Sequence, residues 1–163
     1  MSRDRLSQVE KSLKRLREQL AGKEDTLTTI APEERVRIKQ QIADLKKDEI
    51  RPFEEEYWQI LTERVPTVDI VDLEAEAVIT EIVERVKLLE QNPQYSPEIL
   101  DLLQKIYAEV SQPETPAAAK LKGALSLLPP FVSLSYEAEI DTESFLRSNF
   151  PTFRKWASAL AKK

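Results

Sequence analysis

The chain has 163 residues, of which 41% are hydrophobic and 33% are charged, enough for one ordinary domain or two small ones. It contains neither cysteine nor histidine, which excludes disulfides, thiol or imidazole catalysts, and Cys/His zinc sites. Two glycines, Gly22 and Gly123, stand against ten prolines, so few positions favour positive φ and tight β-turns. This composition predicts a mainly all-α protein.

Charge is unevenly distributed along the chain. Residues 1–50 carry 12 positive and 10 negative side chains, residues 51–112 carry 5 and 14, and residues 113–163 carry 7 and 5. The acidic centre argues against nucleic acid as a partner, because phosphate binding requires a basic surface. The basic cluster at 11–17 is interpreted as a solvated helix face, since Glu10 and Glu18 flank it. With no 18-residue apolar run and no apolar signal-peptide core, we expect a cytoplasmic protein without a membrane partner.

A heptad pattern dominates the N-terminal segment. Apolar residues recur at alternating steps of three and four, at Leu6, Val9, Leu13, Leu16 and Leu20. Leu27 and Ile30 continue the register, and Lys23 is its one mismatch. This narrow seam predicts a long helix that needs a partner helix to be stable.

A second helix is predicted after Ala31-Pro32, where proline suits the first helical position. The apolar positions expected to face the first helix are Val36, Ile38, Ile42, Leu45 and Ile50. The two helices predict an antiparallel hairpin over residues 1–65, with intermolecular coiled-coil pairing as the alternative. Pro52 either kinks the second helix or starts a third, which carries a core of aromatic residues. The triplet 54–56 is not a metal site, because consecutive helical residues point about 100° apart.

Residues 66–163 are predicted to form a helical bundle. Asp69 or Asp72 caps a core helix with apolar residues from Leu73 to Leu89, and Ser96-Pro97 and Thr115-Pro116 open two more helices. Pro129-Pro130 is expected to stop helix formation.

One β-strand is predicted over residues 131–141. Apolar and polar residues alternate there, with Val132, Leu134, Tyr136 and Ile140 on the apolar side. No other segment alternates similarly, so the strand is expected to pack on a helical surface, to pair with a second copy, or to pair with another protein. Asp141 then caps an aromatic-rich end divided at Pro151, in which Phe145, Phe153 and Trp156 either dock on the body or form a recognition surface.

Two stretches carry a resemblance to a known family. Residues 13–61, LKRLREQLAGKEDTLTTIAPEERVRIKQQIADLKKDEIRPFEEEYWQIL, and residues 121–156, which include the sequence SYEAEIDTE, cover just over half of the chain. They resemble the helical effector-associated adaptor segments of cyanobacterial multidomain signalling and conflict proteins, found beside signal-transduction ATPases, caspase-like proteases and pentapeptide-repeat proteins. The resemblance implies a module that joins protein components by like-with-like or partner contacts.

The sequence therefore predicts a non-enzymatic protein-interaction module without cofactor or metal. Two isolated glycines exclude a phosphate-binding loop, and no nucleophile has a recognisable base. The expected partner is a second copy or another signalling protein. The residues expected to contact it are Leu6, Val9, Leu13, Leu16, Leu20, Val132, Leu134, Tyr136, Ile140, Phe145, Phe153 and Trp156. The alternative is a small-molecule sensor binding its ligand among Tyr57, Trp58, Tyr107, Phe145 and Trp156.

Overall fold

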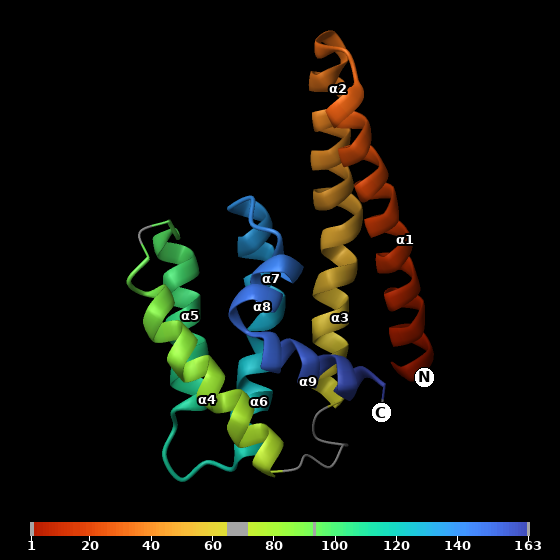
Figure 1. Cartoon of the computed structure of the whole chain (residues 1–163). Helices are drawn as coiled ribbons and strands as arrows, with labels where there is room; N and C mark the ends of the chain where they lie inside the picture. The colour runs from red at the N-terminus through yellow and green to blue at the C-terminus, as the bar shows by residue number, and fades with distance from the viewer. Residues whose placement is uncertain (1, 65–71, 93, 163) are drawn as a thin grey trace. The chain divides into compact units, whose positions relative to one another are not determined.

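The computed structural model describes residues 2–64, 72–92 and 94–162, and over these ranges the chain is mainly helical with no strand (Figure 1). None of these helices is both long enough and apolar enough to cross a membrane. The elements of the first half are α1 (Ser2–Thr29), α2 (Pro32–Asp44), the π-helix η1 (Leu45–Ile50) and α3 (Arg51–Arg64). Those of the second half are α4 (Asp72–Leu89), α5 (Pro97–Val110), α6 (Ala117–Ser126), α7 (Leu128–Glu137), α8 (Thr142–Asn149) and α9 (Pro151–Ala161).

The chain divides into two compact units, Met1–Tyr57 and Trp58–Lys163, and the division falls within α3. The predicted domain boundary between residues 65 and 66 lies outside the described residues. The same holds for Asp69 and for the side chain of Asp72, which were the predicted caps of α4.

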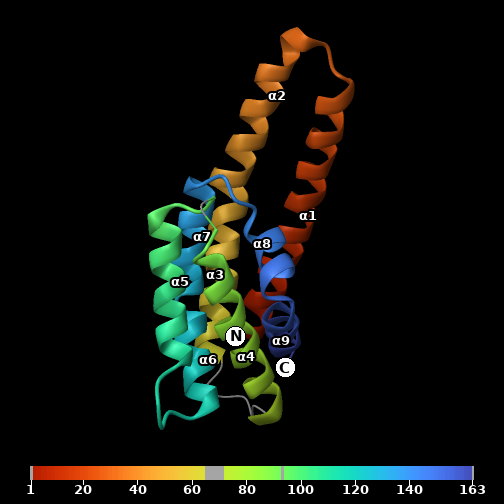
Figure 2. The ribbon, with the colours of Figure 1, turned by 60° about the vertical axis from the view of Figure 1, so that its left-hand side comes forward.

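The N-terminal unit is a helical hairpin. Helix α1 packs along α2 and η1, and the two arms run side by side in two views (Figures 1 and 2). Ala31 between them is extended, with φ −62° and ψ 145°, and Pro32 opens α2. Proline fits there because the first helical N–H has no intrahelical partner. The heptad seam of α1 therefore finds a partner within its own chain.

Pro52 lies just past a change in helix type. The N–H of Arg51 bonds to the carbonyl of Lys46, five residues back, which closes the π-helical segment. The next residue is proline, which has no N–H to donate to the preceding turn. The wider turn and the proline thus coincide, and α3 starts directly after η1 without an intervening loop.

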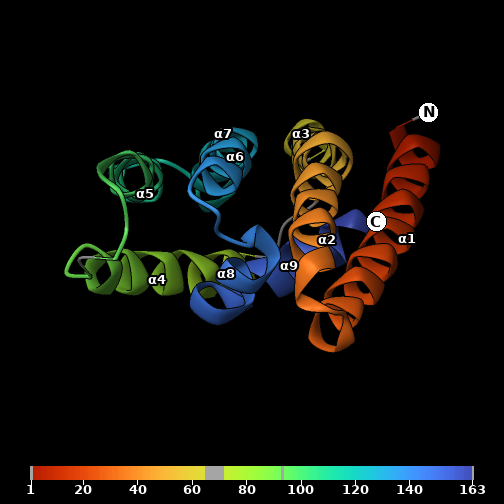
Figure 3. The same ribbon diagram turned by 90° about the horizontal axis from the view of Figure 1, so that it is seen from above.

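The C-terminal unit is a bundle in which α4, α5 and α6 pack on one another and α4 also packs on α9. Seen from above, α5 and α6 are viewed nearly end-on while α4 runs lengthwise, so α4 crosses them obliquely (Figure 3). Two predicted caps are confirmed: Ser96 accepts a hydrogen bond from the N–H of Ile99 at 3.4 Å, and Asp141 from that of Ser144 at 3.2 Å. Both satisfy an N–H that the first helical turn leaves free.

The predicted strand over residues 131–141 is wrong, because most of this segment belongs to α7. Pro129 and Pro130 do not stop helix formation there; they occupy the first turn of α7, where their missing N–H groups cost nothing. The buried positions follow helical steps of three, four and seven from Leu128, at Leu128, Phe131, Val132 and Ser135. Ser135 is fully buried, and its hydroxyl donates to the carbonyl of Phe131 at 2.8 Å. Ser135 is polar but buried. Because the sequence analysis took it as a surface residue, the segment fitted an alternating strand pattern better than a helical one.

Helix α7 ends in a Schellman motif. The N–H of Ile140 donates to the carbonyl of Ser135 at 2.8 Å, and the N–H of Glu139 donates to the carbonyl of Tyr136 at 3.3 Å. Glu139 has φ 59°, a left-handed conformation that glycine adopts with less strain. This turn directs the chain to Asp141, the cap of α8.

Candidate functional site

The seam of α1 separates into two halves. In the half near the N-terminus, Leu6, Val9, Leu13 and Leu16 are each at most 4% exposed. These four residues were predicted to contact a partner, but the structure buries them within the chain. Leu20, the fifth predicted residue of the seam, is half-buried.

The far half of the hairpin leaves its apolar residues partly uncovered. On the α1 arm, Leu20, Leu27 and Ile30 are half-buried, and on α2 Ile42 is half-buried. Val36 is 77% exposed, so the prediction that it faces α1 is wrong. We call the four half-buried residues, Leu20, Leu27, Ile30 and Ile42, the distal hairpin surface; Val36 lies on the other side of α2 and is not part of it.

The position of Val36 follows from helix geometry. Ile38, Ile42 and Leu45 are spaced by four and three residues and share one face of the continuous α2–η1 helix. Val36 precedes Ile38 by two residues, which turns it about 200° away from that face. The sequence alone could therefore have predicted that Val36 points away from α1, if each residue had been given its angle around the helix axis at about 100° per residue.

A polar pair lies within the seam beside this surface. Lys23, the mismatch in the heptad pattern, donates from Nζ to Oε1 of Gln41 on α2 at 3.0 Å. A polar residue at a seam position lowers stability but specifies how two helices align. The pair therefore fixes the register of α1 against α2 where apolar packing is thinnest.

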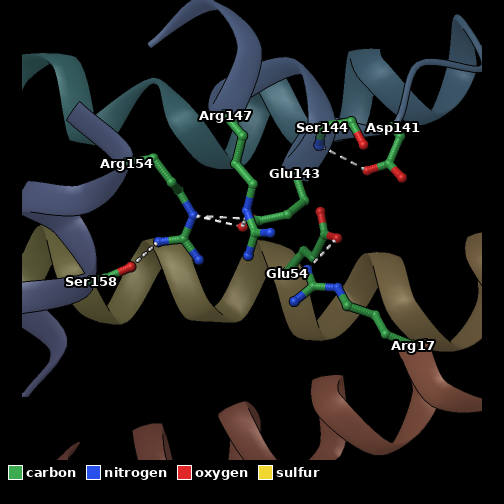
Figure 4. Close-up of polar contacts among 8 residues, drawn as sticks. All are labelled: Arg17, Glu54, Asp141, Glu143, Ser144, Arg147, Arg154 and Ser158. Atoms are coloured by element: carbon green, nitrogen blue, oxygen red, sulfur yellow. Dashed lines mark hydrogen bonds and ion pairs between the residues drawn. The ribbon is translucent and has the colours of Figure 1, made fainter. Parts of the chain in front are cut away.

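Charged side chains also tie the hairpin together. Arg17 Nη2 lies 2.7 Å from Oε1 of Glu54, whose side chain is buried (Figure 4). Arg5 donates to both carboxylate oxygens of Glu56, with an Nη2–Oε1 distance of 2.6 Å. This hydrogen bonding lowers the pKa of Glu56 and raises that of Arg5. Glu55 instead pairs with Arg51, so the three consecutive carboxylates have different cationic partners.

Of the seven apolar residues singled out in the C-terminal unit, three are buried in its core and four are half-buried. Val132, Phe145 and Phe153 are buried, while Leu134, Tyr136, Ile140 and Trp156 are half-buried. Phe145 contacts Phe131 with ring centroids 5.2 Å apart, and Phe153 stacks on Trp58 at 5.9 Å. The structure therefore uses the aromatic C-terminal segment to hold the bundle together.

The polar groups of this unit fix its C-terminal helices. Arg154 donates from Nε to both oxygens of Glu143 at 3.0 and 3.1 Å and from Nη1 to Ser158 at 2.8 Å (Figure 4). The guanidinium also lies 5.4 Å from the ring centroid of Trp58. Glu81 accepts hydrogen bonds from the N–H groups of Thr152 and Phe153 at 3.1 and 3.0 Å, so α4 caps α9. These contacts hold the C-terminal helices against one another.

One cavity in the C-terminal unit is small and apolar. It has a volume of about 20 Å³, close to that of one water molecule, and Phe131, Phe150 and Phe153 are among its lining residues. Ligand pockets of known proteins are roughly 300 to 1,000 Å³. None of the five rings predicted to bind a ligand lines it. Within the described ranges, no group of three or more acidic residues is placed to hold a metal ion.

Comparison with known proteins adds no relative. No family model matches the chain, and the searches of curated proteins and of solved structures found no match.

Proposed function

We propose that the protein is a non-enzymatic interaction module whose contact surface is the distal hairpin surface. The supporting observation is the difference between the two halves of the hairpin. The seam is at most 4% exposed from Leu6 to Leu16, whereas in the far half Leu20, Leu27 and Ile30 are half-buried.

The apolar residues of the far half gain from a third or fourth helix. Two helices alone cannot cover both sides of a seam, so its residues keep part of their surface in water. Burying an exposed Leu, Ile or Val side chain contributes roughly 1.5 to 3 kcal/mol. The four residues of the distal hairpin surface are already more than half buried, so covering the rest would supply at most about 2 to 4 kcal/mol toward binding an apolar helical face.

The resemblance to effector-associated adaptor segments points to the same class of function. Residues 13–61, which carry that resemblance, include the whole distal hairpin surface. We therefore assign the chain to a bacterial signalling or conflict system, in the cytoplasm, as an adaptor or oligomerisation module.

Site-specific photo-cross-linking tests this function. A photoreactive amino acid replaces Ile30 or Ile42 in the full chain expressed in bacterial cells. The matched controls replace Gln8, exposed on the near half of α1, and Ala119, exposed on α6. We expect adducts of one defined protein mass from the two distal positions and none from the controls.

The absence of adducts from the distal positions, or equal labelling at all four, would overturn the proposed function. The mass of the adduct identifies the partner class: twice the mass of the chain indicates a second copy, and any other mass indicates a different protein.

A further inference from the structure

We propose that the π-helix η1 is a register-correcting turn, a conformational device whose one extra residue keeps both halves of the second hairpin arm facing α1. The second arm consists of α2, η1 and the part of α3 up to Tyr57. The proposal concerns the folding of the hairpin and does not depend on the proposed function.

The apolar pattern of the second arm contains an offset of one residue. Two sets of residues follow helical steps of three and four along it: Ile38, Ile42 and Leu45, then Ile50, Phe53 and Tyr57. The step from Leu45 to Ile50 is five residues, one more than a helical seam allows. In a regular α-helix, at about 100° per residue, Ile50 would lie about 140° around the axis from Leu45. The two sets would then face different sides.

Ion pairs show that the second set faces α1. Glu54 and Glu56 lie on opposite sides of this set, because each is one residue away from one of its members. Glu54 pairs with Arg17 of α1 at 2.7 Å, as Figure 4 shows, and Glu56 accepts a hydrogen bond from Nη2 of Arg5 at 2.6 Å. The face between the two carboxylates therefore meets α1.

The first set faces α1 as well. Beside it, Gln41 accepts a hydrogen bond from Lys23 of α1 at 3.0 Å. Ile38 and Leu45 are 7% and 4% exposed. Both sets thus meet the same partner helix, although an uninterrupted α-helix could not direct both of them to it.

Helix η1 absorbs the offset at the place where it occurs. It spans Leu45–Ile50, the five-residue step, and the N–H of Arg51 donates to the carbonyl of Lys46, five residues back instead of four. A turn closed in this way holds one residue more than an α-helical turn, so the residues after it are displaced by one position. The displacement brings Ile50 back to the side of Leu45.

An all-α second arm would direct lysines toward α1. With the phase of the second set kept, steps of four and three back from Ile50 give the residues that would face α1: Lys46, Ala43, Lys39 and Val36. Two ammonium groups would then enter the seam near Lys23, which is costly because no opposite charge accompanies them. In the structure Lys39 is exposed and Val36 is 77% exposed, so the wider turn keeps this face in water.

Deletion of one lysine at either of two places tests the proposal. Removing Lys47, exposed in η1, takes out the extra residue and joins the two sets into one α-helical seam. Removing Lys39, exposed on α2, is the matched control, because Ile38 on one side of the gap or Leu45 on the other must then turn away from α1. Amide hydrogen exchange of α1 residues 17–29, followed by mass spectrometry, measures how well the far half is held. We expect exchange no faster than in the parent chain after deletion of Lys47, and at least about tenfold faster after deletion of Lys39.

Pro52→Ala separates the seam from the proline as the cause of the wider turn. NMR detects the hydrogen bond between the Arg51 N–H and the Lys46 carbonyl as a scalar coupling across it. We expect this bond to persist in Pro52→Ala, since the offset in the apolar pattern remains. A shift of the bond to the carbonyl of Lys47, four residues back, would make the proline the cause and overturn the proposal. Equal exchange rates in the two deletion chains would overturn it as well.

Discussion

The two units of the molecule use their apolar residues differently. In the C-terminal unit, the 14 residues of α5 bury five side chains, at Ile99, Leu102, Leu103, Ile106 and Val110. In the N-terminal unit, the 13 residues of α2 bury only Ile38. The stripe of α5 is wide enough to contact several neighbours, whereas α2 carries a seam one or two residues wide. A helix of the first kind completes a core, and one of the second kind leaves room for another helix.

The sharpest test of this contrast concerns α7, where the sequence pattern and the structure disagree. Ser135→Glu should destabilise the C-terminal unit by about 3 kcal/mol or more, because it places a carboxylate at a fully buried position. Urea denaturation followed by circular dichroism measures the loss.

Ala138→Glu is the matched control. It introduces the same side chain three residues later, at an exposed position, and should change stability by less than about 0.5 kcal/mol. A strand would give the opposite order, because Ala138 would face inward and Ser135 outward. Greater damage from Ala138→Glu would therefore refute the helical assignment of this segment.

Local chemistry explains which parts of the fold could be predicted. Few glycines, the proline at the start of α2, and the caps at Ser96 and Asp141 are local features, and each led to the correct element. The strand prediction failed because only tertiary packing makes Ser135 a core residue. Leu73 was assigned to the apolar stripe of α4 but is 83% exposed, because it precedes the buried Ala75 by two residues and so lies on the opposite side of the helix.

The two glycines provide a second, smaller test of the same contrast. A Cβ at Gly22 of α1 would meet nothing within 4 Å, so Gly22→Ala should stabilise the hairpin by about 0.5 to 1 kcal/mol through helix propensity. At Gly123 of α6, a Cβ would lie 2.9 Å from Cδ and 3.2 Å from Cβ of Glu109. The crowding atoms include the carboxylate end of the flexible Glu109 side chain, which must shift to admit a methyl group and so offsets the gain in helix propensity. Gly123→Ala should therefore stabilise the bundle less than Gly22→Ala stabilises the hairpin.

The double variant Gly123→Ala/Glu109→Ala separates crowding from other effects. Because Glu109 supplies the crowding atoms, its removal should restore the full helix-propensity gain of alanine at position 123, a coupling that thermal denaturation of the four chains measures. If Gly123→Ala stabilised the protein as much as Gly22→Ala, α5 and α6 would be packed less closely than the structure shows, and the two units would not differ in this respect.

The interaction surface was only partly predictable from the sequence. The heptad spacing identified the α1 seam, but it gave all five residues equal weight. Only the structure shows that Leu6 to Leu16 are covered and that coverage decreases from Leu20 onward. Coverage depends on which other segments fold against the seam, and residue spacing within one helix does not contain that information.

The smallest expected effect is the pH dependence of the Arg5–Glu56 pair, which ties together the two arms of the hairpin. The pKa of Glu56 is lowered in the folded chain because Arg5 donates hydrogen bonds to the charged carboxylate. The pair therefore contributes to stability above the ordinary carboxyl pKa of about 4.5, and that contribution disappears as the pH falls through the lowered folded value. Glu56→Gln should lower the unfolding temperature at pH 7, and its difference from the parent chain should shrink as the pH falls below about 4.5, whereas Glu18→Gln, exposed on α1, should have little effect throughout. If the Glu56→Gln chain were as stable as the parent at pH 7, the Arg5–Glu56 pair would contribute nothing measurable. The buried apolar residues of the near half would then account for its stability without this ion pair.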